Sequence, residues 1–344
     1  MSAEALEALR GKPAIYHVIS RVVNREFVLG REEKEEFVRL MRLYERFCGV
    51  RVLTFCVMSN HFHILLEVPA RPEGAFGSDE ELLEHLGVLY SGAKLREIGR
   101  ELDLLRGHKA DWRACRERYL GRMWDLSQFM KTLKQRFSQW FNRRHGRRGV
   151  LWEDRFKSVL VEDGHAARVM AAYIDLNPVR AGMVGDPADY RWSGYAQAVA
   201  GREEARAGLR RVMIEWERMR MSTEMAAQET ANWRKVIGCY RVILFRDGEE
   251  KAPAAGGKRR RGIARGKAEE VAGKKGRMSE GELLTRRVRY FADGLVIGSA
   301  AFVDRAWRMT REYFGAARTS GARKLRGVDS GLRSMRDLCR DVYG

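Results

Sequence analysis

The sequence predicts an α+β fold built on one β-α-β-β-α-β unit, and three observations support this prediction. Four short runs are rich in β-branched and aromatic residues and contain neither Gly nor Pro, as is typical of strands. Two longer segments carry apolar residues at helical spacing. The order along the chain is also the required one, with strands at 15–22, 50–57, 61–68 and 156–161 and helices at 32–47 and 126–141. This order of elements is that of a ferredoxin-like, or RRM-like, domain.

The first half of this unit has the clearest boundaries. In the segment 32–47 the apolar residues from Phe37 to Phe47 recur every three or four positions, and Gly49 follows as a candidate C-terminal cap. Residues 58–60 turn the chain from the second strand into the third. The third strand ends before Pro69, because proline has no N–H to donate to a strand ladder.

The second half is interrupted by a long helical segment. Residues 79–124 are predicted to be helical with one break near Gly107, so we expect an inserted helical hairpin within 70–125. In the helix at 126–141, Ser127 is a candidate N-cap and Gly146 a candidate terminator. A further helix at 164–176 follows the last strand and ends before Pro178, since the residue preceding a proline is pushed out of helical geometry.

Composition divides the chain into four parts. We expect a core domain at 13–200, a helical extension at 201–250, a basic linker at 251–278 and a small helical unit at 279–344. The linker lacks aromatic residues, contains four consecutive cations at 258–261 and is predicted to be disordered. In the last unit we expect helices at 283–291, 299–314 and 330–343. That unit is either a helix-turn-helix reader of duplex DNA or a dimerisation cap.

The charge indicates a polyanionic partner. The 344 residues include 65 Lys and Arg against 46 Asp and Glu, a net charge of +19. Nucleic acid is the leading candidate and an anionic membrane surface the second. No apolar run approaches the ~18 residues that a membrane span needs, and the first residues lack the pattern of a secretion signal. Five scattered cysteines without metal-ligand spacing favour reduced thiols in a cytoplasm.

The first candidate site residues are His61 and His63. Side chains two apart on a strand point the same way, so both imidazoles share one face. Such a pair can hold one divalent metal ion and leave positions for a third ligand and a substrate. The alternative, and the commoner meaning of a bare His-x-His, is a pair of polar residues on an exposed sheet face. His17 on the first strand is a candidate to support this pair rather than to bind metal.

The second candidate pair is Tyr173 and Asn177, which are four residues apart and share a helix face. A tyrosine hydroxyl with a pKa near ~10 is a poor nucleophile, but a metal-polarised phosphodiester is a better target and allows a covalent phosphotyrosine. The Asn177 amide oxygen is a candidate third metal ligand. The alternatives are a half-buried core aromatic for Tyr173 and a helix C-cap before proline for Asn177.

Four segments together resemble the REP-associated tyrosine transposases, within the single-tyrosine HUH, or IS200-like, transposases. The segments are YHVISR at 16–21, VMSNHFHIL at 57–65, LWEDRF at 151–156 and YIDLNPVRAG at 173–182, in the order of that family. The resemblance implies a nuclease domain that cuts single-stranded DNA beside a REP-like hairpin and stays attached through a 5′-phosphotyrosine. Each segment alone is a weak signal, and it is their combination that is specific.

The same resemblance implies residue roles and partners. It implies His61 and His63 as metal ligands, Tyr173 as the nucleophile, Asn177 as a helix-borne amide ligand, and Mg²⁺ or Mn²⁺ as the metal. It also implies a bacterial, cytoplasmic, nucleoid-associated protein that acts as a monomer or homodimer and binds no membrane. The insertion at 70–125 and the extension after residue 202 are longer than the family pattern, which leaves the DNA groove and the oligomeric state open.

Basic residues near these segments are candidate DNA contacts. They are Arg21, Lys131, Lys134, Arg136, Arg155, Lys157 and Arg180. Phosphate contacts of this kind give affinity and salt dependence rather than sequence choice. Two other functions stay open. One is a binding module that uses its sheet face as RNA-recognition domains do, although histidines stand where their stacking rings would be. The other is an inactive relative kept for DNA binding or regulation.

Overall fold

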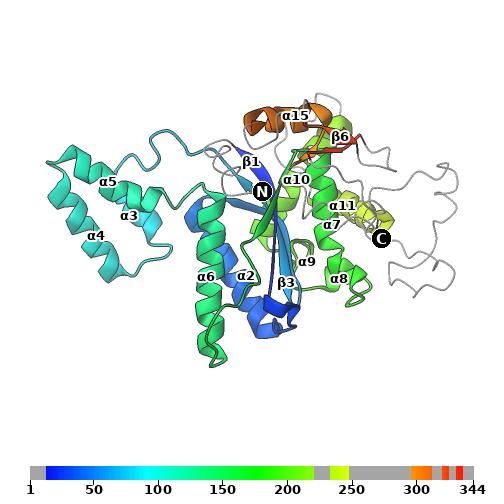
Figure 1. Ribbon diagram of the computed structural model, residues 1–344, viewed down its shortest axis with the longest axis horizontal. Coiled ribbons are helices and arrows are strands. Elements are labelled where there is room, and N and C mark those ends of the chain that lie inside the picture. The colour runs from blue at the N-terminus through cyan, green and yellow to red at the C-terminus, as the bar shows by residue number, and fades with distance from the viewer. Residues whose placement is uncertain (1–12, 221–232, 248–295, 312–319, 325–330, 336–344) are drawn as a thin grey trace.

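The computed structural model describes residues 13–220, 233–247, 296–311, 320–324 and 331–335, and the chain folds around one mixed sheet (Figure 1). The core elements follow the predicted order. They are β1 (Ala14–Arg21), α2 (Arg31–Cys48), β2 (Arg51–Val57), β3 (His61–Val68), α6 (Leu126–Arg144) and β4 (Lys157–Val161). The sheet order begins β2-β3-β1-β4, with each of these neighbours antiparallel. The predicted ferredoxin-like fold is therefore confirmed.

The helix ends follow local capping chemistry. Gly49 adopts φ +63° directly after α2, where a Cβ-bearing residue is disfavoured, so its predicted role as a C-cap is confirmed. At the start of α6 the cap is Asp125, whose side chain accepts a hydrogen bond from the Gln128 amide at 2.8 Å. The prediction of Ser127 as this cap is wrong, because Ser127 already lies inside the first turn.

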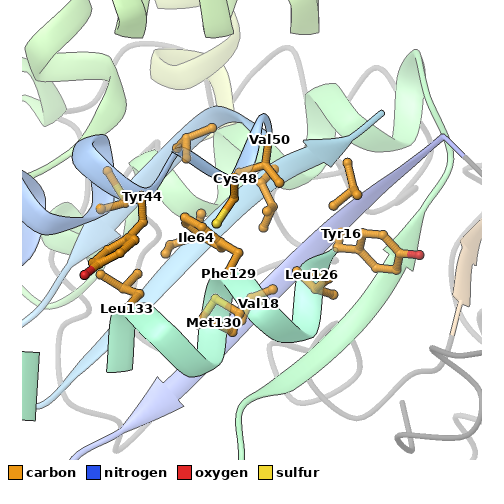
Figure 2. Close-up of a cluster of buried hydrophobic side chains, with 14 of the residues drawn as sticks. Tyr16, Val18, Tyr44, Cys48, Val50, Ile64, Leu126, Phe129, Met130 and Leu133 are labelled. Atoms are coloured by element: carbon orange, nitrogen blue, oxygen red, sulfur yellow. The ribbon is translucent and has the colours of Figure 1, made fainter. Parts of the chain in front are cut away.

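One face of the sheet packs against α2 and α6 (Figure 2). Val18 of β1 and Ile64 of β3 point toward Phe129 and Leu133 of α6 in this buried cluster. These side chains are 0% exposed, and apolar burial of this kind is the main favourable term in folding. The predicted apolar stripes of both helices are thus the ones that face the sheet.

The opposite face is covered by helices that follow β4. They are α7 (His165–Asp175), α8 (Asn177–Arg180), α9 (Gly194–Val199), α10 (Glu203–Arg220) and α11 (Trp233–Asp247), with the short 3-10 turn η2 (Pro187–Asp189) between α8 and α9. Figure 1 shows α7, α10 and α11 on the side of the sheet away from α2 and α6. At Gly208 a Cβ would lie 2.4 Å from the Leu53 carbonyl oxygen, so α10 rests directly on the β2 backbone. The sheet is therefore buried on both faces.

The insertion contains three helices rather than a hairpin. They are α3 (Asp79–Leu86), α4 (Gly92–Leu105) and α5 (Lys109–Leu120). The predicted break near Gly107 is present, and a second break follows α3, where the Ser91 side chain caps α4. Figure 1 shows these helices projecting away from the sheet, beyond α6. His85 ties them to the core through its Nε2, which lies 2.9 Å from the Phe47 carbonyl oxygen.

Residues near the C-terminus extend the same sheet. β5 (Val296–Gly298) pairs in parallel with β4, β7 (Arg333–Ser334) pairs with β5, and β6 (Arg323–Lys324) pairs with β7. The helix expected at 299–314 is present as α15 (Ala300–Met309). The prediction of a helix at 330–343 is wrong, because Arg333–Ser334 form the strand β7. Strands of two or three residues carry no readable periodicity. The linker at 251–278 and the helix expected at 283–291 lie outside the described residues. Within the described ranges, no helix is both long and apolar enough to cross a membrane.

Candidate functional site

Both histidines of the third strand lie on the face that α7 covers. His61 pairs with Arg21 and His63 with Ile19 across the β1–β3 ladder, so the two imidazoles share one face as predicted. Their ring centroids are 5.1 Å apart, with the rings nearly perpendicular. His63 is 2% exposed, whereas His61 is half-buried at the start of the strand. His61 is therefore the solvent side of the pair and His63 the inner side.

His17 completes a row of three imidazoles. Its Nε2 lies 2.9 Å from Nδ1 of His63, and the two rings stack with centroids 5.2 Å apart. One of these nitrogens donates and the other accepts. When His63 donates from Nδ1 to His17, its Nε2 keeps a lone pair for another ligand.

Asn60 sets the tautomer of His61. Its Nδ2 donates to the Arg25 carbonyl oxygen at 3.0 Å, which turns its Oδ1 toward Nδ1 of His61 at 2.6 Å. An amide oxygen only accepts, so Nδ1 of His61 carries the proton and Nε2 has the free lone pair. Both imidazoles of the pair can thus present Nε2 lone pairs.

Tyr173 of α7 packs against these rings. Its ring centroid lies 5.7 Å from that of His63 and 6.3 Å from that of His17, both edge-on. The tyrosine, from a segment distant in the sequence, thus lies against one imidazole of the pair and against His17, and its convergence with the pair on a metal ion stays a prediction. Tyr173 is 0% exposed, and the Arg180 guanidinium lies 4.9 Å over its ring and donates to its carbonyl oxygen at 2.9 Å.

Burial dominates the protonation states at this site. It lowers the pKa of His61 to about 4, with Arg21 adding to the effect, and it lowers the pKa of His63 well below its ordinary value. Burial also raises the pKa of the Tyr173 hydroxyl, against smaller lowering by Arg180 and Arg21. At neutral pH the imidazoles are uncharged, which metal binding requires, and the phenol keeps its proton.

Asn177 begins α8 rather than capping α7, whose C-cap is Leu176. Its Nδ2 donates to the carbonyl oxygens of Tyr173 at 3.3 Å and Ile174 at 3.2 Å. These bonds use the amide nitrogen and leave the amide oxygen for another partner. Among the described residues, no group of three or more His, Cys, Asp or Glu side chains is arranged to hold a metal ion. A metal here thus needs the histidine pair together with an amide or substrate oxygen.

The predicted DNA contacts divide into two groups. Arg21 and Arg180 lie at the site, because Arg21 pairs with His61 across the β1–β3 ladder and the Arg180 guanidinium lies 4.9 Å from the centroid of the Tyr173 ring. Lys131, Lys134 and Arg136 belong to α6 on the other face of the sheet, while Arg155 and Lys157 are exposed at the start of β4.

Lys134 is tied into the fold. Its Nζ donates to the Asp154 carbonyl oxygen at 2.7 Å, and burial lowers its pKa to about 8. Trp152, beside it, packs against Phe37, Phe62 and Phe137, so this tryptophan is a core residue rather than an exposed stacking surface.

Asp175 is a structural partner of the site that sequence reasoning missed. It is 0% exposed and accepts hydrogen bonds from Thr54 Oγ1 at 2.8 Å, the Tyr195 amide at 3.2 Å and the Tyr240 hydroxyl at 2.6 Å. Burial raises its pKa to about 7, against lowering by these three donors. The available signal was a lone carboxylate between Ile174 and Leu176, at the end of a helix whose second half is apolar apart from Tyr173.

Fold and site together define a ferredoxin-like domain with an imidazole pair and a tyrosine converging on one sheet face. Residues 12–73 match the family described as "Transposase IS200 like", a segment that contains His17, His61 and His63. The resemblance to IS200-like transposases is therefore confirmed there, while Tyr173 and Asn177 lie beyond the matched segment.

A solved structure described as the REP-associated tyrosine transposase bound to a REP hairpin is similar at 15% identity and a TM-score of 0.35, over 55% of this chain and 80% of that one. A search of curated proteins found no match.

Proposed function

We propose that this protein is a metal-dependent endonuclease and strand transferase that cleaves single-stranded DNA beside a hairpin and forms a 5′-phosphotyrosine. The observation that carries the proposal is the packing of Tyr173 against His63, 5.7 Å between ring centroids, from segments 110 positions apart in the sequence. The IS200-like sequence of residues 12–73 supports the same reaction class. The net charge of +19 fits a nucleic-acid substrate.

His61 and His63 would hold the metal through Nε2, with the Asn177 amide oxygen as a third ligand. Two imidazole nitrogens suit Mn²⁺ better than Mg²⁺, which prefers oxygen ligands. When bound, the ion would withdraw negative charge from the scissile phosphate. Arg21 and Arg180 would neutralise the remaining phosphate charge from the protein side.

Tyr173 would supply the nucleophile. Its hydroxyl oxygen attacks phosphorus as it loses its proton, the bond from phosphorus to the 3′ oxygen breaks, and the 3′ end leaves as a hydroxyl. The 5′ phosphate remains on the tyrosine, and attack by a 3′ hydroxyl reverses the step. The number of phosphoester bonds does not change, so rejoining needs no nucleotide cofactor.

Access is the condition on this reaction. The Tyr173 hydroxyl is buried and His63 is 2% exposed, so no phosphodiester reaches them in this conformation. Helices α7 and α8 carry Tyr173, Asn177 and Arg180, and their displacement from the sheet would admit the strand. DNA binding and movement of these helices are therefore expected together.

A covalent-adduct assay tests the proposal. Labelled single-stranded hairpin DNA is incubated with the protein and Mn²⁺, and the products are separated on a denaturing gel. Wild type is expected to retain label on the protein, Tyr173→Phe to retain none, and Tyr44→Phe, on the other face of the sheet, to behave as wild type. Adduct formation by Tyr173→Phe would overturn the assignment of the nucleophile.

A second function is favoured by one observation, the complete burial of Tyr173. A non-catalytic nucleic-acid-binding or regulatory protein needs no access to that hydroxyl. It would bind hairpin DNA with the same strong salt dependence and give no adduct under any metal condition.

A further inference from the structure

The loop between β1 and α2, which is anchored on the turn that precedes His61, presents an exposed aromatic ring. Phe27 is 80% exposed and is the only aromatic among the large, strongly exposed apolar side chains of the described residues. A ring this exposed is available to contact a ligand.

The loop is held rigidly on the segment that leads into His61. Val22 donates from its amide to the Asn60 carbonyl oxygen at 2.8 Å, and Leu29 donates to that of Ser59 at 2.9 Å. Between them, Asn60 Nδ2 holds the Arg25 carbonyl oxygen at 3.0 Å. Phe27 is two residues from both Arg25 and Leu29, so its Cα lies within roughly 7 Å of each anchored position.

The backbone of this loop is strained. Asn24 and Arg25 both adopt positive φ, 54° and 56°, in the short 3-10 turn η1 (Val23–Arg25). Asparagine tolerates this region, whereas an arginine in it is strained. Such strain persists where the surrounding contacts enforce it, and here the Asn60 side chain supplies that contact.

Asn60 joins this loop to the site. One end of its amide holds Arg25, and the other end holds Nδ1 of His61 at 2.6 Å. The loop position and the orientation of a proposed metal ligand are thus set by a single side chain. A group bound on the loop is thereby placed at a fixed position relative to His61.

The surroundings carry charges of both signs and are partly apolar. Val23 donates to the Leu151 carbonyl oxygen at 2.9 Å. This bond brings the segment that contains Val150, which is 75% exposed, next to the β1–α2 loop. Exposed cations on these two segments are Arg25, Arg31 and Arg148, and exposed carboxylates are Glu26, Glu32 and Glu153. Glu32 is paired with Arg144 at 2.9 Å. An exposed aromatic ring on a loop that also carries arginines can bind an unpaired base by stacking.

We propose that Phe27 is the stacking platform for an unpaired base of the bound strand, next to the phosphate held at His61. The inference rests on the proposed function, because it takes the strand to be cut between the histidine pair and Tyr173. It adds a base subsite on the β1–α2 loop, which positions the strand without contacting the reacting phosphate. Stacking accepts any base, so the subsite contributes affinity and register rather than sequence choice.

The test compares two strands that differ only in their bases. Fluorescence anisotropy in EDTA, which prevents metal-dependent cleavage, measures binding of a 15-nucleotide oligo-dT and of an abasic strand of equal length. Phe27→Ala is expected to bind oligo-dT ~5- to 100-fold more weakly than wild type and the abasic strand equally well. Phe27→Trp is expected to restore oligo-dT binding. Leu104→Ala, at an 81% exposed position of the insertion, is the matched control and should bind as wild type.

Three results would overturn the proposal. They are equal weakening of both strands by Phe27→Ala, no weakening of either, or a change in the oligomeric state of the free protein on sedimentation, which would make Phe27 a contact between copies. The adduct gel separates this failure from failure of the proposed function. A base-dependent loss with no adduct from wild type leaves the subsite standing and removes the nuclease.

Discussion

The carboxylate of Asp175 accepts a 2.6 Å hydrogen bond from the hydroxyl of Tyr240, which joins the helix that carries Tyr173 to α11. The same carboxylate reaches Thr54 on β2 and the amide of Tyr195 at the start of α9. Helix α7 is thus fastened at three points by a side chain two residues from the proposed nucleophile. Because Asp175 is fully buried, its ionised form is costly to keep in the fold, and these hydrogen bonds offset part of that cost.

Asp175 makes the stability of the protein depend on pH. Its pKa is about 7 in the folded chain and ~3.9 in an unfolded one, so between these values only the folded state holds the proton. The contribution of Asp175 to the free energy of unfolding is fully present below pH ~4 and is lost as the pH rises through about 7. Each pH unit between the two pKa values lowers the free energy of unfolding by about 1.4 kcal/mol.

Asp175→Asn removes this dependence. As the pH rises from 5 to 8, wild type is expected to lose about 3 kcal/mol of unfolding free energy that the variant keeps. Urea denaturation at both pH values measures this. Other carboxylates titrate alike in both proteins and cancel in the comparison. A constant difference between the two proteins would show that Asp175 is ionised in the fold throughout.

Tyr240→Phe tests the link to α11. Loss of the hydroxyl removes one donor from Asp175, and the expected destabilisation is about 1–3 kcal/mol. The loss should be greater at pH 8 than at pH 5, because the bond favours the ionised carboxylate. Tyr195→Phe is the matched control. It removes a hydroxyl that contacts partly exposed Arg241 at 3.1 Å and keeps the Tyr195 amide on Asp175, so its cost should stay below ~1 kcal/mol. Equal effects of the two variants would contradict the link.

The contrast between Asp175 and the histidine pair explains what the sequence could predict. The sequence singles out His61 and His63 because side chains on a strand have a period of two, and Phe62 and Ile64, which alternate with them, are core residues. The four strands and both core helices follow from the same local periodicities. Asp175 acts through Thr54, Tyr195 and Tyr240, which are distant from it in the sequence. No local sequence pattern around any of these residues predicts their contact with Asp175.

The helices that cover the second face of the sheet could not be predicted from the sequence for the same reason. The close approach of Gly208 to Leu53 and the parallel pairing of Val296–Gly298 with β4 are contacts between distant segments. Tyr173 is fully buried in the apolar cluster that α7 shares with α10, α11 and β5, whereas the sequence indicated only a position on a helix face. The N-cap of α6 was misassigned because Asp125 and Ser127 are both good capping residues.

His17 is expected to act on the metal through His63. Replacing it by phenylalanine keeps a ring in the stack but removes the Nε2 atom that lies 2.9 Å from Nδ1 of His63. Loss of such a partner typically weakens metal binding by about 10- to 100-fold. Calorimetric titration of the DNA-free protein with Mn²⁺ measures the change. His85→Phe, in the insertion, should titrate as wild type, and an unchanged affinity in His17→Phe would remove the supporting role.

The insertion is expected to contribute little to DNA affinity, and its charge gives the reason. Residues 70–124 contain ten Lys and Arg and ten Asp and Glu, so the net charge of +19 comes entirely from the rest of the chain. Replacing Arg155 and Lys157 together by alanine is expected to reduce the slope of log affinity against log salt by about 1.4 for single-stranded DNA, about 0.7 for each lost phosphate contact. Replacing exposed Arg96 and Arg100 of α4 together should leave the slope unchanged. Binding of a labelled oligo-dT over a series of salt concentrations measures both slopes, and a smaller slope in the α4 variant would place DNA on the insertion.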